Sequence, residues 1–144
     1  MSLDDLETAL DGNAILINSQ DGGFLRYENG GWSGTLTAIA SGQMYKVKAT
    51  AAVSLEIEGA YVASTEVTIL PGYNWFGYTG TTTTAIATAL GDFQPTNGDT
   101  IVDEDNNTAT YTNGAWSSTT LTDLVPGKGY VYLSNDSGSK TISF

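Results

Sequence analysis

Internal self-similarity constrains this chain most, because a repeated segment must build the same supersecondary unit each time it occurs. Residues 12–58 align with residues 98–143 in order and spacing, with two small gaps. The matched pairs are Gly12/Gly98, Ile15/Ile101, Tyr27/Tyr111, Asn29/Asn113, Gly30/Gly114, Trp32/Trp116, Ser33/Ser117, Leu36/Leu121, Thr37/Thr122, Ile39/Leu124, Gly42/Gly127, Tyr45/Tyr130 and Ile57/Ile142. The sequence therefore predicts two tandem copies of one unit, in residues 4–62 and 63–144.

The two predicted copies differ at their N-terminal ends. A short Ala- and Leu-containing segment that predicts a helix precedes the alignment in each copy, at residues 4–10 and 84–90. In the second copy, residues 67–78 come before that helix and have no counterpart in the first. Either the first copy is N-terminally truncated, which is our expectation, or it borrows a strand from elsewhere.

The remaining segments predict short strands. Runs of Thr, Val, Ile and aromatic residues alternate with Gly, Asn and Asp. Asn29-Gly30 and Asn113-Gly114 each lie between a Tyr and a Trp, and Asn-Gly is the pair that favours a two-residue hairpin. Leu55 and Ile57 alternate with polar residues, as in a half-buried strand, and Val67 and Ile69 do the same. We therefore predict a mainly β protein: two tandem copies of a small barrel- or sandwich-like module of about five strands, each with one short helix.

The repeat also predicts which side chains face the core. Residues 45–48 align with residues 130–133, and Lys46 and Lys48 belong on a solvent-facing side. The side chains expected to point inward are Tyr45, Val47, Tyr130 and Tyr132, and those expected to point outward are Val131 and Leu133. The outward apolar pair predicts a contact with the other copy or with a partner.

Composition excludes several function classes. The chain carries 16 acidic and 5 basic residues, a net charge of -11, which disfavours binding to nucleic acid and to anionic membranes. It has no Cys and no His, so it cannot build a thiolate metal site or an imidazole-based catalytic triad. No apolar run reaches the roughly 20 residues that a membrane-spanning helix needs, so no membrane insertion is expected.

Two further motifs carry a resemblance to a known family. They are Pro71-Gly72-Tyr73-Asn74-Trp75-Phe76-Gly77-Tyr78 and Pro126-Gly127-Lys128-Gly129-Tyr130, with the helix and the Tyr/Gly/Trp hairpin between them. This pattern resembles the tandem Trp-Asn-Trp / Pro-Gly-x-Gly-Tyr repeat module of secreted and surface proteins of Bacteroidetes-type bacteria. The second copy covers the full pattern, with Tyr73 where Trp is usual. The resemblance implies an extracellular or cell-surface accessory module.

The first candidate site is an aromatic platform on residues 73–78. Tyr73 and Trp75 share one face of the predicted strand, whereas Phe76 and Tyr78 share the other with Asn74. One face belongs to the core, and the other could be an exposed surface on which sugar rings stack. Tyr73, Trp75 and Tyr78 are therefore candidate ligand-binding residues, and burial of both faces is the alternative.

The second candidate site is an acidic turn. Asp103, Asp105 and Asn107 have the spacing that opens a calcium-binding loop. The match then fails, because Thr108 replaces the required Gly and Gly114 replaces the bidentate Glu. The turn is either a calcium site or a solvated acidic turn, and no other cofactor is expected.

The third candidate site is a carboxylate pair for glycoside hydrolysis, with Asp99 beside Asp92 or Asp103. That chemistry requires two carboxyl groups at a defined separation across a sugar cleft, and Asp99 after Gly98 is also typical of a strand start or turn.

We thus predict a non-catalytic structural or adhesion module of a larger surface protein. Its partner would be a polysaccharide or another surface protein. An accessory carbohydrate-binding module is the first alternative, and a small carboxylate-dependent glycoside hydrolase is the second.

Overall fold

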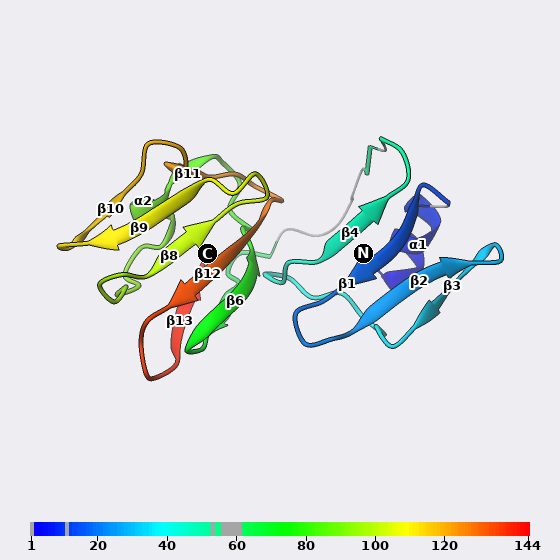
Figure 1. The fold of residues 1–144 in the computed structure, drawn as a ribbon, viewed down its shortest axis with the longest axis horizontal. Helices are drawn as coiled ribbons and strands as arrows, with labels where there is room; N and C mark the ends of the chain where they lie inside the picture. The colour runs from blue at the N-terminus through cyan, green and yellow to red at the C-terminus, as the bar shows by residue number, and fades with distance from the viewer. Residues whose placement is uncertain (1, 11, 53, 56–61) are drawn as a thin grey trace. The chain divides into compact units, whose positions relative to one another are not determined.

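Two compact units make up the chain (Figure 1). The computed structural model describes residues 2–10, 12–52, 54–55 and 62–144. Unit 1 contains Met1–Ala40 and Tyr45–Val62, and unit 2 contains Ser41–Met44 and Ala63–Phe144. Both units are mainly β, as predicted, and no sheet in the described residues closes into a barrel.

One helix and one four-stranded antiparallel sheet form unit 1, with strand order β3-β2-β1-β4. The elements are α1 (Leu3–Leu10), β1 (Ala14–Asn18), β2 (Phe24–Glu28), β3 (Gly31–Gly34) and β4 (Lys46–Ala49). Helix α1 buries Leu6 and Leu10, which lie four residues apart and therefore on one face of the helix. These two leucines form the core of unit 1 with Ala14, Ile17 and Leu25.

Unit 2 has a five-stranded antiparallel sheet of order β10-β9-β8-β12-β6 and two smaller strand pairs, β5–β13 and β7–β11. The elements are β5 (Glu66–Ile69), β6 (Gly72–Gly77), β7 (Thr84–Ala85), α2 (Ile86–Ala89), β8 (Thr100–Val102), β9 (Thr108–Thr112), β10 (Ala115–Ser117), β11 (Asp123–Leu124), β12 (Gly129–Ser134) and β13 (Lys140–Ser143). The predicted second helix is thus a single turn that follows a short strand.

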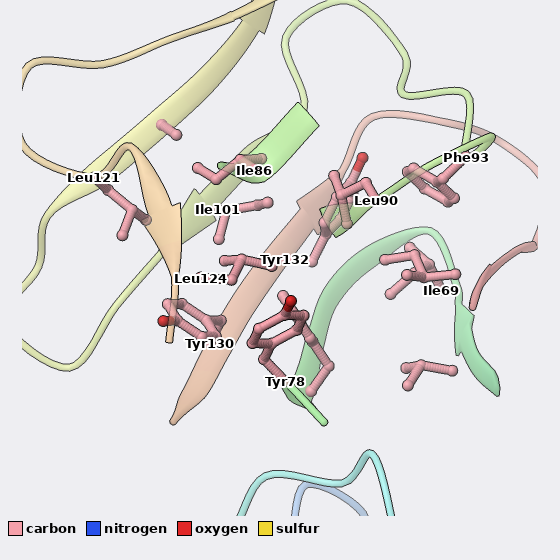
Figure 2. Close-up of a cluster of buried hydrophobic side chains, with 14 residues drawn as sticks. Ile69, Tyr78, Ile86, Leu90, Phe93, Ile101, Leu121, Leu124, Tyr130 and Tyr132 are labelled. Carbon is pink, nitrogen blue, oxygen red and sulfur yellow. The ribbon is translucent and has the colours of Figure 1, made fainter. Parts of the chain in front are cut away.

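A single hydrophobic cluster joins these parts of unit 2, and Figure 2 shows its side chains converging between the strands. Strands β5 and β13 contribute Val67, Ile69 and Ile142, whereas the five-stranded sheet contributes Phe76 and Tyr132 among others. Val67 and Ile69 are buried and alternate with exposed residues, which confirms the half-buried pattern predicted for this strand. The described residues of unit 2 therefore form several sheets around one hydrophobic cluster, and none of these sheets closes into the barrel that was one of the two predicted forms.

Each unit contains the predicted Asn-Gly hairpin. Asn29 and Asn113 have φ of 54°, and the glycines that follow them have φ of 82° and 85°. Positive φ at both central residues gives the turn that matches the twist of the flanking strands. The Tyr–Trp pair beside each turn has nearly the same geometry in both units. The ring centroids are 5.3 Å apart with an interplanar angle of 62° for Tyr27 and Trp32, and 5.5 Å apart with an angle of 60° for Tyr111 and Trp116.

The first strand of the alignment needs a correction. The sequence pairs Ile15 with Ile101, but Ile17 is the residue that lies opposite Leu25 of β2 and Val47 of β4. Ile101 holds the same position in unit 2, opposite Ala109 and Tyr132. Unit 1 has two more residues than unit 2 between the aligned glycine and this isoleucine, and a register irregularity between Ala14 and Leu16 absorbs one of them.

The predicted side-chain directions are right for the second copy and partly wrong for the first. Tyr130 and Tyr132 are fully buried, and Val131 and Leu133 point to the other face. Val47, predicted to lie in the core, is 44% exposed. The physical reason is that β4 is the last strand of its sheet among the described residues, whereas β12 lies between β8 and β6. Ile57 lies outside the described residues, and Leu55 is exposed and not in a strand.

Candidate functional site

One face of the five-stranded sheet of unit 2 carries the predicted aromatic residues. Tyr73 lies opposite Leu133, which lies opposite Thr100, and Trp75 lies opposite Val131, which lies opposite Val102. We call these six residues the outer face. Tyr73 is 69% exposed, and the other five are partly exposed. Strand β9 continues this surface with Thr108 and Thr110. The surface is therefore aromatic at the β6 end and carries hydroxyl groups at the β9 end.

The third predicted platform residue lies elsewhere. Tyr78 is buried, and its hydroxyl donates a hydrogen bond to the Thr82 carbonyl at 3.3 Å. Its ring meets Phe144 edge-on, with centroids 5.2 Å apart. Tyr78 therefore belongs to the core face, as the alternation with Trp75 requires, and it cannot take part in a surface formed by Tyr73 and Trp75.

Asn74 explains how β6 presents these aromatic residues. This buried side chain accepts a hydrogen bond from the Leu70 amide at 2.8 Å and donates to the carbonyl oxygens of Leu70 and Gly72 at 2.7 and 2.9 Å. These bonds close the turn that enters β6 and satisfy a polar group that burial would otherwise penalise. The turn fixes the alternation that sends Tyr73 and Trp75 outward.

The acidic turn brings its three predicted residues together. Asp103 Oδ1 accepts hydrogen bonds from the amides of Asp105 and Asn107, each at 2.9 Å, and its Oδ2 accepts one from Asn107 Nδ2 at 2.9 Å. Both carboxylate oxygens therefore already hold donors of the turn itself. Within the part of the chain that the structure describes, no group of three acidic residues is arranged to hold a metal ion.

Asp99 lies in the interior of unit 2. It is fully buried, and its Oδ2 accepts hydrogen bonds from the Tyr132 hydroxyl at 2.6 Å and the Thr96 amide at 2.7 Å. Its Oδ1 accepts a third bond from the Asn135 amide at 2.7 Å. Burial, reinforced by the Asp99 carboxylate, raises the pKa of Tyr132 far above its usual range. This geometry leaves Asp99 no exposed oxygen to offer a substrate beside Asp92 or Asp103.

A small pocket in unit 2 escapes prediction from the sequence. It has a volume of about 240 Å³ and is lined mainly by apolar groups of α2, β9 and the following loop, with Trp116 on one side. The only polar atoms of its side chains belong to Trp116, Ser118 and Thr122. The Ser118 hydroxyl already donates to the Thr108 carbonyl at 2.8 Å and accepts the Leu121 amide at 2.7 Å. The repeated Trp is the only sequence signal for this pocket.

The two units differ in the helix that precedes the repeated tryptophan. In unit 1 the Trp32 indole nitrogen donates to the Glu7 carbonyl of the eight-residue helix α1 at 3.2 Å. In unit 2 the helix is only four residues long. The indole of Trp32 thus has a backbone partner on the longer helix of unit 1, whereas Trp116 lines the pocket in unit 2.

Comparison with protein-family models, with curated proteins and with solved structures finds no significant match to this chain. In the described residues, no helix is both long and apolar enough to cross a membrane.

Proposed function

We propose that this chain is a non-catalytic structural or adhesion-type segment of a larger extracellular surface protein, built from two copies of one β module. The observation that carries the proposal is an anchor that occurs twice. The Tyr45 hydroxyl accepts a hydrogen bond from the Ala40 amide at 2.9 Å, and the Tyr130 hydroxyl accepts one from the Val125 amide at 2.8 Å. Each tyrosine lies near the start of its strand, β4 or β12, and bonds the amide five residues before it.

The chemistry of the acidic residues supports a structural role. Asp99 stabilises the interior of unit 2, and Asp103 closes a turn. Asp136 joins β13 to the loop at Thr96 by an ion pair with Lys140 at 2.6 Å and a hydrogen bond from the Thr96 hydroxyl at 2.9 Å. These carboxylates serve the fold, and an enzyme would need some of them directed at a substrate.

Turnover assays on the full chain test this proposal. A panel of glycosidase, esterase and peptidase substrates is expected to give no activity above background. Asp92→Asn and Asp103→Asn are the matched variants, because neither aspartate is buried in the core. Activity that disappears in one of these folded variants would overturn the non-catalytic proposal.

A second candidate function is saccharide binding by the outer face, favoured by the exposure of Tyr73 on the same strand face as Trp75. Aromatic rings on such a surface offer flat apolar faces with polar edges. A glycan and polysaccharide array, probed with and without calcium, tests this function. Binding is expected to fall in Tyr73→Ala and Trp75→Ala and to persist in Phe24→Ala, an exposed aromatic residue of unit 1.

Equal binding by all three variants would remove the outer face from the proposal. Calcium-dependent binding would instead implicate the Asp103 turn.

A further inference from the structure

The two sheets differ by one strand, and that strand covers a specific edge. In unit 2, β12 pairs with β8 on one side and with β6 on the other. In unit 1, β4 pairs with β1 on the side that corresponds to β8, and no strand of the described residues pairs with its other side. All four residues of β4 are exposed, whereas those of β12 are buried or partly buried.

We propose that the open side of β4 at Val47–Ala49 accepts an antiparallel strand of the Gly72–Gly77 type from a second polypeptide. This inference rests on the proposed function, because it treats the units as copies of one module. An exposed strand edge presents backbone donors and acceptors that an added strand can satisfy. Unit 2 then shows which kind of strand fits, and in which register.

The register follows from the Tyr anchors. Tyr130 lies opposite Phe76, Tyr132 opposite Asn74, and Leu133 opposite Tyr73. Because Tyr45 holds the position of Tyr130, an incoming strand would place its Phe76 equivalent opposite Tyr45. Its Asn74 equivalent would then lie opposite Val47, and its Tyr73 equivalent opposite Lys48.

Tyr45 is the residue of unit 1 against which such a strand would pack. In unit 2 the fully buried Phe76 stacks on Tyr130, with centroids 5.5 Å apart. Among the described residues, no aromatic ring stacks on Tyr45. In unit 2, Phe76 and Asn74 lie opposite the buried Tyr130 and Tyr132. An added strand would cover Tyr45 and Val47, the corresponding residues of unit 1, in the same way.

Charge selects this occupant over the β4 strand of a second copy. Two β4 strands paired with each other would bring Lys46 and Lys48 of one chain close to those of the other, and like charges on adjacent strands repel. The Gly72–Gly77 segment carries no charge, and its Tyr and Trp would lie beside the lysines, where cation–π contact is favourable.

The test uses the isotope-labelled full chain and a synthetic peptide of residues 70–79 as the added strand. The amides of Val47, Lys48 and Ala49 are expected to shift in a saturable, one-to-one titration. Val47→Asp should weaken binding by about tenfold or more, because the added strand would bury a carboxylate. Ser33→Asp, an exposed position on the opposite edge strand β3, should bind as the unmodified chain does.

Three results would overturn the inference. They are the absence of saturable binding, shifts that lie outside β4, and self-association of the chain through Val47–Ala49 without the peptide. The spectrum of the free chain separates this inference from the proposed function. A folded β1–β4 sheet without peptide uptake would remove the acceptor edge alone, whereas an unfolded unit 1 would remove the two-module proposal as well.

Discussion

Strands β4 and β12 follow the same type of tyrosine-anchored turn and yet lie in different environments. Both tyrosine hydroxyls bind the amide five residues earlier. Strand β12 lies inside a five-stranded sheet and buries Tyr130, Tyr132 and Ser134, whereas β4 lies at an edge and buries none of its residues. The comparison teaches that the local turn fixes where a strand begins, while the neighbouring strand decides whether its side chains form a core.

The largest effect is expected from removing the side chain that β6 adds to the core of unit 2. Phe76→Ala should lower the free energy of unfolding of unit 2 by about 3–5 kcal/mol, because it leaves a cavity beside Tyr130. Val47→Ala in unit 1 should cost less than about 1 kcal/mol, since Val47 is already exposed. A urea titration followed by amide signals of each unit measures both losses of stability. The two units have separate hydrophobic clusters, so a lower unfolding midpoint of unit 1 in Phe76→Ala would contradict this account.

The second effect concerns the carboxylate of Asp99. Asp99→Asn should destabilise unit 2 by about 2–3 kcal/mol, because an amide cannot accept all three buried hydrogen bonds. In unit 1 the comparable bond uses backbone atoms, from the Thr50 amide to the Asn13 carbonyl at 2.8 Å. Asp92→Asn is the control because Asp92 is exposed, and it should cost less than about 1 kcal/mol in the same urea titration. Equal losses in the two variants would show that Asp99 has no special structural role.

The third effect tests the shared anchor directly. Tyr130→Phe should cost unit 2 about 1–2 kcal/mol, because it leaves the partly buried Val125 amide without its acceptor. Tyr45→Phe should cost unit 1 about 0.5 kcal/mol, because the Ala40 amide is exposed to water. Thermal unfolding of the two variants gives the comparison, and no loss in Tyr130→Phe would refute the anchor.

The smallest effect is a pH dependence of unit 2. Hydrogen bonds from Lys140, the Gly138 amide and the Thr96 hydroxyl hold the pKa of Asp136 well below its usual range. A depressed pKa adds stability above the unfolded value of about 4 and loses it as the pH falls through the folded pKa. Unit 2 should therefore unfold more easily in acid. This loss should be shallower in Asp136→Asn than in the control Asp92→Asn, as measured by urea midpoints at neutral pH and near pH 3.

Local signals account for the parts of the fold that the sequence predicts. The Asn-Gly pairs locate both hairpins, and alternation assigns Phe76 and Trp75 to opposite faces, because each needs only neighbouring residues. The register irregularity in β1 and the one-turn helix α2 were missed, since both depend on packing against distant strands. Val47 shows the same limit, because its exposure depends on a strand pairing that its own segment does not encode.

The candidate site also has features that the sequence predicts and features that only the structure shows. Alternation already separates Tyr78 from Tyr73 and Trp75, but only the structure shows that the face with Tyr73 and Trp75 is the exposed one. The spacing of Asp103, Asp105 and Asn107 located a real turn, but only the hydrogen bonds show that the turn uses its own carboxylate. The saccharide and calcium hypotheses stay predictions.

Amide hydrogen exchange of β4 and β12 in the full chain tests the central claim most directly. That claim is that unit 1 is the same module as unit 2 with one strand fewer. It predicts strong protection in Val131–Leu133, which pairs with β8 on one side and with β6 on the other, and fast exchange at the amides of Val47–Ala49 that do not face β1. Protection of every amide in Val47–Ala49 equal to that in β12 would contradict the claim, because the edge of β4 would then already be covered.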